Sequence, residues 1–145
     1  MRVYTPKPVG SNPCICARVR RGARALTALY DTALAPAGLN VAQFSLLRHI
    51  EHLGPIGVRA LAESSGHERS TLARTLRPLE GAGWIEIRRG ADRRTREARL
   101  TDTGRATLRQ AAPLWKQAQR TADARLDGEH DTLFRLLERL EIPAA

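Results

Sequence analysis

The sequence predicts a mainly α-helical fold of about six helices plus a two-stranded β hairpin. Its 145 residues suit one domain with a sizeable core. Hydrophobic residues make up 42% of the chain but aromatic residues only 4%, so the core must be aliphatic, which suits helices packed on helices. Apolar residues recur every three or four positions along most of the chain, and partial alternation replaces this period only after Gly83.

The N-terminal part is predicted to be an irregular arm followed by one long helix. Prolines and a glycine interrupt residues 1–11, whereas Ser11 or Asn12 can cap a helix over 12–36. One face of this helix is apolar, through Ile15, Val19, Ala23, Leu26 and Tyr30. The segment Pro36-Ala37-Gly38 ends it.

Three shorter helices are predicted between residues 39 and 80. The first runs from Leu39 to Leu53 and stops at Gly54-Pro55. A short helix follows over 57–64, and a turn at 64–66 leads to a helix that begins near Glu68. The inward side chains of this last helix are Leu72, Leu76 and Leu79.

The C-terminal part is predicted to hold the hairpin and two further helices. Strands at 84–88 and 96–100 flank a charged loop, and Thr101 then caps a long helix. The apolar positions of that helix have nearly heptad spacing, and the last helix follows Gly128 with Leu133, Leu136, Leu137 and Leu140. Pro78 and Pro113 lie inside helices, which they should kink without necessarily ending them.

A short helix, a tight turn, a second helix and a basic hairpin together make a winged helix-turn-helix. In this arrangement the second helix, about 68–80, enters the major groove of DNA and its first residues meet base edges. The side chains expected to contact DNA are His67, Arg69, Ser70, Thr71, Arg74, Thr75 and Arg77. A helix cap or a solvated face is the alternative for any single Ser or Thr.

The hairpin loop, or wing, at 88–96 holds five arginines and a single acid. Phosphates or the minor groove would balance this charge, so we expect DNA contacts from Arg88, Arg89, Asp92, Arg93, Arg94 and Arg96. We expect Asp92 to pair with a neighbouring arginine and stiffen the loop, an ordinary surface ion pair being the alternative. The formal net charge of +9 also favours a polyanionic partner, although a solvated basic surface would explain it too.

Three motifs resemble the signature of the MarR family of bacterial regulators. They are Leu79-Glu80-(x2)-Gly83-Trp84-Ile85, Asp92-Arg93-Arg94 and Leu100-Thr101-(x2)-Gly104, supported by Leu61-Ala62 and Ser70-Thr71-(x2)-Arg74. The resemblance covers roughly residues 20–140. It implies an obligate dimer, with an interface formed by the first helix and the last two helices. It also implies repression through a near-palindromic operator, with the wing arginines in the flanking minor grooves. It also implies functional roles for Asp92 and Arg94.

The residues themselves also favour a homodimer. The apolar faces of 104–126 and of the last helix are long for so small a domain, and a second copy would cover them, unless they fold back onto their own core. We therefore divide the chain into an arm (1–11), a dimerisation helix (12–36), a DNA-binding lobe (37–100) and C-terminal dimerisation helices (101–145).

Two switches are candidates for controlling the regulator. The resemblance implies release by a small aromatic or phenolic effector, with Tyr30, Phe44, His49 and Trp115 as candidate pocket residues, although each could equally be core. Thiol oxidation is the other candidate, since Cys14 and Cys16 would lie in the first turn of a helix near three arginines. Their alternative role is that of small buried apolar residues.

Other functions find little support in the sequence. No phosphate loop, nucleophile elbow or metalloprotease motif occurs, so we expect neither an enzyme nor a cofactor, and His49 with His52 alone predicts no metal site. The absence of a signal peptide, a membrane span and a disulfide framework indicates a cytoplasmic protein. A winged helix used for protein contact, or for non-specific DNA binding, remains the alternative.

Overall fold

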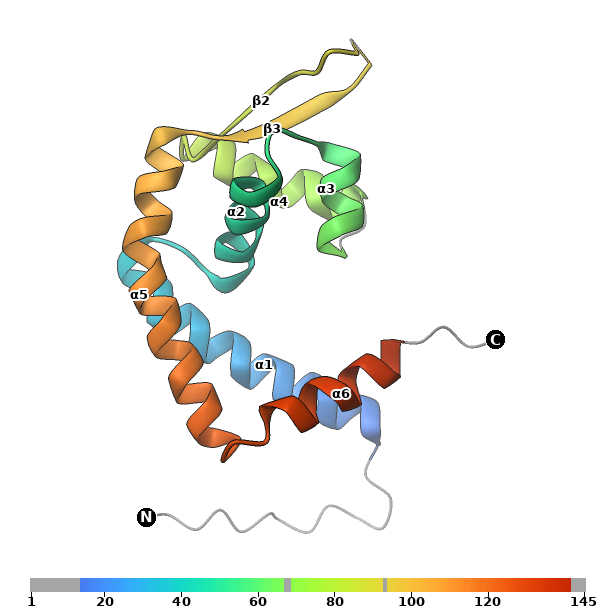
Figure 1. Cartoon of the computed structure of the whole chain (residues 1–145), viewed down its shortest axis with the longest axis vertical. Coiled ribbons are helices and arrows are strands. Elements are labelled where there is room, and N and C mark those ends of the chain that lie inside the picture. Colours follow the sequence, from blue (N-terminus) through green and yellow to red (C-terminus); the bar gives the residue numbers. More distant parts are fainter. Residues whose placement is uncertain (1–13, 67–68, 93, 142–145) are drawn as a thin grey trace.

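The computed structural model describes residues 14–66, 69–92 and 94–141, and it is mainly helical (Figure 1). The arm at 1–11, His67 and Arg93 lie outside the described residues, and so does the side chain of Arg69. The helices are α1 (Ile15–Leu34), the short 3-10 helix η1 (Ala35–Ala37), α2 (Val41–Leu53), α3 (Val58–Ser65), α4 (Arg69–Gly81), α5 (Asp102–Arg125) and α6 (His130–Glu141). The strands are β1 (Ile56–Gly57), β2 (Ile85–Arg89) and β3 (Arg96–Leu100).

The start of α2 differs from the prediction. Asn40 is the N-cap residue of α2 and forms a capping box with Gln43. Leu39 therefore precedes the helix and is a buried loop residue. The Asn40 side chain accepts the backbone N–H of Gln43 at 2.8 Å, and the Gln43 side chain accepts the N–H of Asn40 at 3.0 Å. The sequence contains the pattern of this capping box, Asn-x-x-Gln at residues 40–43.

The sheet has three strands rather than the two predicted. Its order is β1-β3-β2, all antiparallel, with Ile56 opposite Ala98 and Ile87 opposite Ala98 on the other side. Strand β1 is two residues long, too short to show a period of two, which is why the sequence did not predict it.

The junction between the hairpin and α5 is closely packed. Thr101 caps α5, as predicted, by accepting the N–H of Gly104 at 3.0 Å, and its own hydroxyl donates to the Gly83 carbonyl at 2.6 Å. A Cβ on Gly104 would lie 2.1 Å from the Trp84 carbonyl oxygen, so only glycine fits there.

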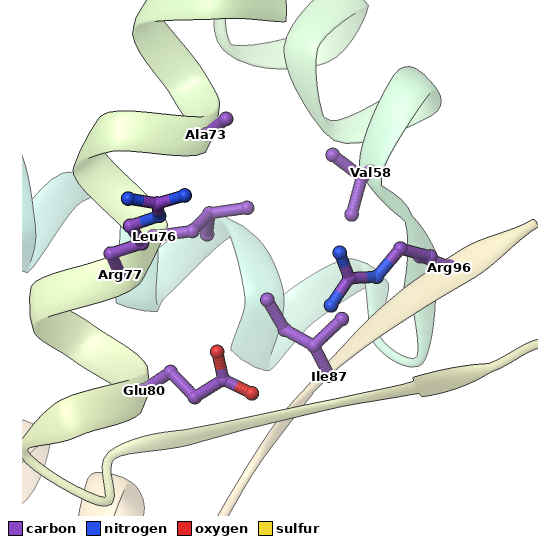
Figure 2. A pocket seen from close by; sticks show the side chains of 7 residues that line it. All are labelled: Val58, Ala73, Leu76, Arg77, Glu80, Ile87 and Arg96. Carbon is purple, nitrogen blue, oxygen red and sulfur yellow. The ribbon is translucent and has the colours of Figure 1, made fainter.

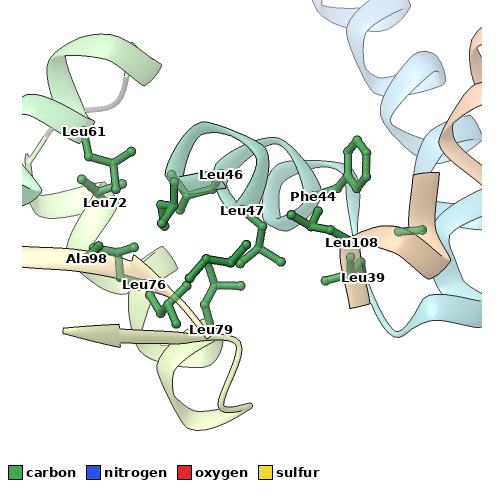
Figure 3. Packing of buried hydrophobic residues seen from close by; sticks show 14 of the residues in the cluster. Leu39, Phe44, Leu46, Leu47, Leu61, Leu72, Leu76, Leu79, Ala98 and Leu108 are labelled. Carbon is green, nitrogen blue, oxygen red and sulfur yellow. The ribbon is translucent and has the colours of Figure 1, made fainter. Parts of the chain in front are cut away.

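The buried core lies in the lobe formed by α2, α3, α4 and the sheet, and the end of α1 and the start of α5 add to it (Figure 3). Its largest fully buried side chains are Leu34, Leu46, Leu47, Ile50, Leu61, Leu72 and Leu79. Pro78 and Pro113 lie inside α4 and α5, which both continue past them. Helix α5 leaves this lobe beside α1, and α6 turns back at the far end of the molecule from the hairpin (Figure 1).

Candidate nucleic-acid interface

Helix α4 presents one apolar and one polar face. Leu72 and Leu79 are fully buried and Leu76 is 2% exposed, which anchors the helix to the lobe as predicted. The opposite face exposes Ser70, Thr71, Arg74 and Arg77. Those side chains are free to meet a groove because the leucine ridge fixes the rotation of the helix.

Helix α3 ends on two small residues, Ser65 and Gly66. Gly66 adopts a left-handed conformation with φ 70°, and the Ser65 hydroxyl donates to the Leu61 carbonyl at 2.6 Å. Leu61 and Ala62 are buried beneath it. Helices α3 and α4 follow each other along the chain and pack together as a helix-turn-helix pair.

Thr75 is less available than its neighbours. It is half-buried, and its hydroxyl donates to the Thr71 carbonyl at 3.0 Å. Its proton is therefore committed within the helix, although the oxygen can still accept a hydrogen bond.

The wing loop is organised by Asp92 through the backbone. Its carboxylate accepts the N–H of Arg94 at 3.1 Å, and its carbonyl accepts both the N–H and the hydroxyl of Thr95, at 2.9 and 2.8 Å. No arginine ion pair to Asp92 occurs among the described residues, so the predicted pairing with a neighbouring guanidinium is not found there. The loop is stiffened by an Asx-type turn instead.

Four arginines of the described wing line one hollow. The concavity has a volume of about 480 Å³ and is lined by Arg88, Arg89, Arg94 and Arg96 together with Ile87. Arg88 is held by Glu86 at 2.7 Å, whereas Arg89, Arg94 and Arg96 have no ion pair within the described part of the chain. A hollow lined by guanidinium groups is suited to phosphate oxygens.

Arg96 also faces α4, the second helix of the helix-turn-helix. Figure 2 shows its guanidinium turned from β3 toward α4, into a cavity of about 290 Å³ that Arg77 and Glu80 share. The floor of this cavity is apolar, formed by Val58, Ala73, Leu76 and Ile87. Arg96 therefore lies at the base of the wing and links it to α4, rather than at the tip of the loop.

The four residues predicted for an effector pocket line one cavity. Tyr30, Phe44, His49 and Trp115 surround about 570 Å³ together with Val41, Ser45, Arg48, His52 and Leu53. The rings of Phe44 and Trp115 stack with centroids 5.9 Å apart and planes 20° apart. The pocket thus lies where α1, α2 and α5 meet.

Sequence reasoning missed the basic side of this cavity. Arg48 and His52 lie one turn apart on the same face of α2 as Phe44, so helical spacing could have found them. The Ser45 carbonyl lies 2.9 Å from Nδ1 of His49 and can only accept, so Nδ1 carries the hydrogen and Nε2 is an acceptor in the neutral ring.

Tyr30 ties the pocket to α5. Its hydroxyl donates to Oε1 of Gln119 at 2.5 Å. Burial raises the pKa of the Tyr30 phenol, and the nearby Asp123 carboxylate adds to the increase.

Both cysteines are exposed and free. Cys14 is the N-cap residue of α1, and Cys16 lies in its first turn. The predicted position at the helix start is therefore correct, and neither side chain is buried within the single chain.

Neither a metal cluster nor a membrane-spanning segment is found in the part of the chain that the structure describes. No three His, Cys, Asp or Glu side chains lie close enough together there to hold a metal ion. None of these helices is sufficiently long and apolar to cross a bilayer.

Comparison with known proteins places this geometry among transcriptional regulators. Residues 39–95 match the model of the MarR family. The uncharacterised HTH-type transcriptional regulator YwoH of Bacillus subtilis is 30% identical over 84 residues, which is 58% of this chain and 61% of YwoH. The chain thus spans under two thirds of that relative.

Solved structures match over nearly the whole chain. The transcriptional regulator MosR of M. tuberculosis, in complex with DNA, is 35% identical, with a TM-score of 0.74 over 90% of this chain and 100% of MosR. A cysteine-to-serine mutant of E. coli MarR with operator DNA has a TM-score of 0.81 at 24% identity, over 89% of this chain and 94% of that one, which supports the fold.

Proposed function

The chain belongs to the MarR family of transcriptional regulators, and on this premise we propose that it is a dimeric repressor of a near-palindromic double-stranded DNA operator. The observation that carries the proposal is the pairing of α4, whose polar face is exposed, with an arginine-rich wing beside it. Such a pair can contact a major groove and the adjacent minor groove of one duplex.

The recognition helix would read bases through its exposed N-terminal half. Ser70, Thr71 and Arg74 offer hydroxyl and guanidinium groups for base edges and phosphates. His67 and Arg69 belong to the same proposal by sequence, and Thr75 contributes as an acceptor. Arg77 lies toward the wing, where it suits a phosphate better than a base.

The wing would enter the flanking minor groove. Arg89 and Arg94 are exposed and have no ion pair among the described residues, so their charge is free to meet phosphates. Asp92 holds the backbone that carries Arg94. Arg93 is part of the proposal on its sequence alone.

A second copy would cover the helices at the other end of the molecule. Helix α6 buries none of its residues, and it exposes Phe134, Leu136 and Leu140 at 49, 50 and 61%. Ile15 and Val19 of α1 are 70 and 40% exposed. Apolar side chains in this number favour a two-fold dimer through α1, α5 and α6.

The cavity beside Trp115 would take a hydroxyaromatic acid as effector. The stacked Phe44 and Trp115 offer an apolar wall for a ring, Arg48 offers a partner for a carboxylate, and Nε2 of His49 can accept a phenolic O–H. Since the cavity joins α1 and α5 to the lobe through α2, a ligand there can change the angle between the dimer helices and α4.

Thiol oxidation is the second switch that we propose. Exposure of Cys14 and Cys16 at the start of α1 makes both sulfurs accessible to peroxide. Oxidation there would alter the end of α1 that the proposed dimer uses. A regulator of this kind acts on the chromosome, so we propose the cytoplasm as its location.

Selection from random DNA duplexes tests this function. Purified protein is incubated with the duplexes at near-physiological salt, with and without peroxide, alongside the Cys14→Ser/Cys16→Ser variant. We expect a near-palindrome whose half-site centres lie about one helical turn apart. Failure to enrich any sequence with folded, dimeric protein would favour protein contact or non-specific DNA binding instead.

The peroxide arm tests the thiol switch separately. We expect peroxide to lower operator affinity for the wild type and to leave the double serine variant unchanged. Equal responses of the two proteins would exclude Cys14 and Cys16 as the sensor, and the aromatic cavity would then be the remaining switch.

A further inference from the structure

Positive charge is concentrated in the N-terminal part of this sequence as well as in the wing. Residues 1–30 contain six Lys or Arg and no Asp or Glu, so they carry +6 of the chain's formal +9. Asp31 is the first acid of the chain. The recognition helix at 68–80 and the wing at 88–96 carry formal charges of +1 and +4, so residues 1–30 are a second concentration of comparable charge.

The described part of this charge lies on one helix. Arg18, Arg20, Arg21 and Arg24 are all exposed on α1. None of them has an ion pair among residues 14–66, 69–92 and 94–141, whereas Arg48, Arg59, Arg88 and Arg105 each pair with an acid. Four neighbouring unpaired guanidinium groups repel each other unless anions neutralise them.

Helical spacing separates these arginines from the apolar side of α1. Arg20 and Arg24 lie one turn apart, with Arg21 between them on the same side. The residues of α1 that approach the rest of the chain, Leu26, Tyr30 and Leu34, continue the opposite stripe, which begins with Ile15 and Val19. We call Arg20, Arg21 and Arg24 the arginine face of α1. A dimer that covers the apolar stripe would leave this face accessible.

The helix that a second copy would bring cannot neutralise this face. Helix α6 carries Asp131, Glu138 and Glu141, but also Arg135 and Arg139. Its formal charges nearly cancel, so the second copy would bring little negative charge to the arginine face. A separate anionic partner would complement it.

The arginine face and the wing lie at opposite ends of the molecule. Figure 1 shows the β2–β3 hairpin at one end of the longest axis and the first turns of α1 at the other. A duplex held by α4 and the wing of this subunit would therefore not run along the arginine face. Any phosphates bound there must belong to another segment of DNA.

We propose that the arginine face of α1 binds the backbone phosphates of a second DNA duplex, so that the operator-bound protein bridges two DNA segments. This inference rests on the proposed operator binding for its first duplex. The contact is independent of sequence, because guanidinium groups on an exposed helix face meet phosphates without reading base edges. It should therefore weaken steeply as salt rises.

A two-duplex capture assay tests the proposal. Operator duplex on beads is loaded with less protein than it can hold, washed, and offered a fluorescent duplex of unrelated sequence. The variant Arg20→Gln/Arg24→Gln is compared with Arg109→Gln/Arg120→Gln, which removes the same charge from exposed positions on α5. The amount of fluorescent duplex captured is divided by the amount of protein that stays on the beads.

We expect the wild type and the α5 control to capture the second duplex equally. The Arg20→Gln/Arg24→Gln variant should capture at least three-fold less, while its affinity for a short operator duplex changes less than two-fold. Equal capture by this variant and the wild type would overturn the inference, and so would the absence of capture by wild-type protein that holds its operator. Neither result would affect the proposed operator binding, whose failure appears as the lack of any selected sequence.

Discussion

Replacing Arg94 with alanine separates DNA binding from folding in this protein. The Arg94 side chain is exposed and has no ion pair among the described residues, and the hydrogen bond to Asp92 comes from the Arg94 backbone N–H. Alanine keeps that N–H, so the Asx-type turn of the wing should persist. The free energy of unfolding should change by no more than about 0.5 kcal/mol.

The expected loss in DNA affinity follows from the two wings of a dimer. An exposed charge contact contributes roughly 0.5–1 kcal/mol, so two lost contacts weaken binding by about 1–2 kcal/mol. This corresponds to about a five- to thirty-fold higher Kd. Because each phosphate contact adds about 0.9 to the slope of log affinity against log salt, the slope should fall by about 1.8.

Fluorescence anisotropy with the selected operator at several salt concentrations measures both quantities. Arg99→Ala is the matched control, since Arg99 is exposed on β3 but does not line the wing hollow. Light scattering checks that the Arg94→Ala variant keeps the assembly state of the wild type. An unchanged Kd and salt slope in that variant would refute the assignment of Arg94 to DNA contact.

Three further predictions concern the framework that holds the site. Leu72→Ala should cost about 2–5 kcal/mol of stability in urea denaturation, because Leu72 is fully buried on the inner face of α4. A loss below about 1 kcal/mol would mean that α4 is not anchored there. Gly104→Ala should destabilise the protein by about 1–3 kcal/mol or more, because the new Cβ would clash with the Trp84 carbonyl oxygen. Gly22→Ala has open space at its Cβ and should stabilise the protein by up to about 1 kcal/mol. Equal effects of the two substitutions would contradict the close packing between the hairpin and α5. The raised pKa of Tyr30 gives stability that is present below the ordinary phenol pKa of 10.0 and is lost as pH rises through the higher folded value. The melting temperature should therefore fall less between pH 9 and about 11 for Tyr30→Phe than for the wild type. Parallel curves of melting temperature against pH would contradict this expectation.

The helix-turn-helix and wing could be predicted from sequence because their signals are local. The leucine spacing in α4, the Thr101 cap and the strand at 96–100 each depend on neighbouring residues alone, and the structure confirms all three. The start of α2 was misplaced by two residues because the Asn40 cap was overlooked. Strand β1 exists only through its pairing with β3, which no local pattern of two residues can encode.

The candidate site was predictable in its residues more than in its contacts. The four pocket residues come from α1, α2 and α5; the family resemblance suggested them as lining one pocket, and the structure places all four around one cavity. Asp92 was predicted to pair with a neighbouring guanidinium, whereas its carboxylate accepts a backbone N–H in the described loop. The turn of Arg96 toward α4 depends on tertiary packing and had no sequence signal.

Chemical footprinting of the selected operator with dimethyl sulfate reports on both grooves at once, because this reagent methylates guanine N7 in the major groove and adenine N3 in the minor groove. We expect protected guanines in two half-sites about one helical turn apart, with protected adenines in the flanking minor grooves. Arg94→Ala should lose the adenine protection and keep the guanine pattern. Protection confined to one groove, or spread evenly along the duplex, would contradict the proposed docking of α4 and the wing.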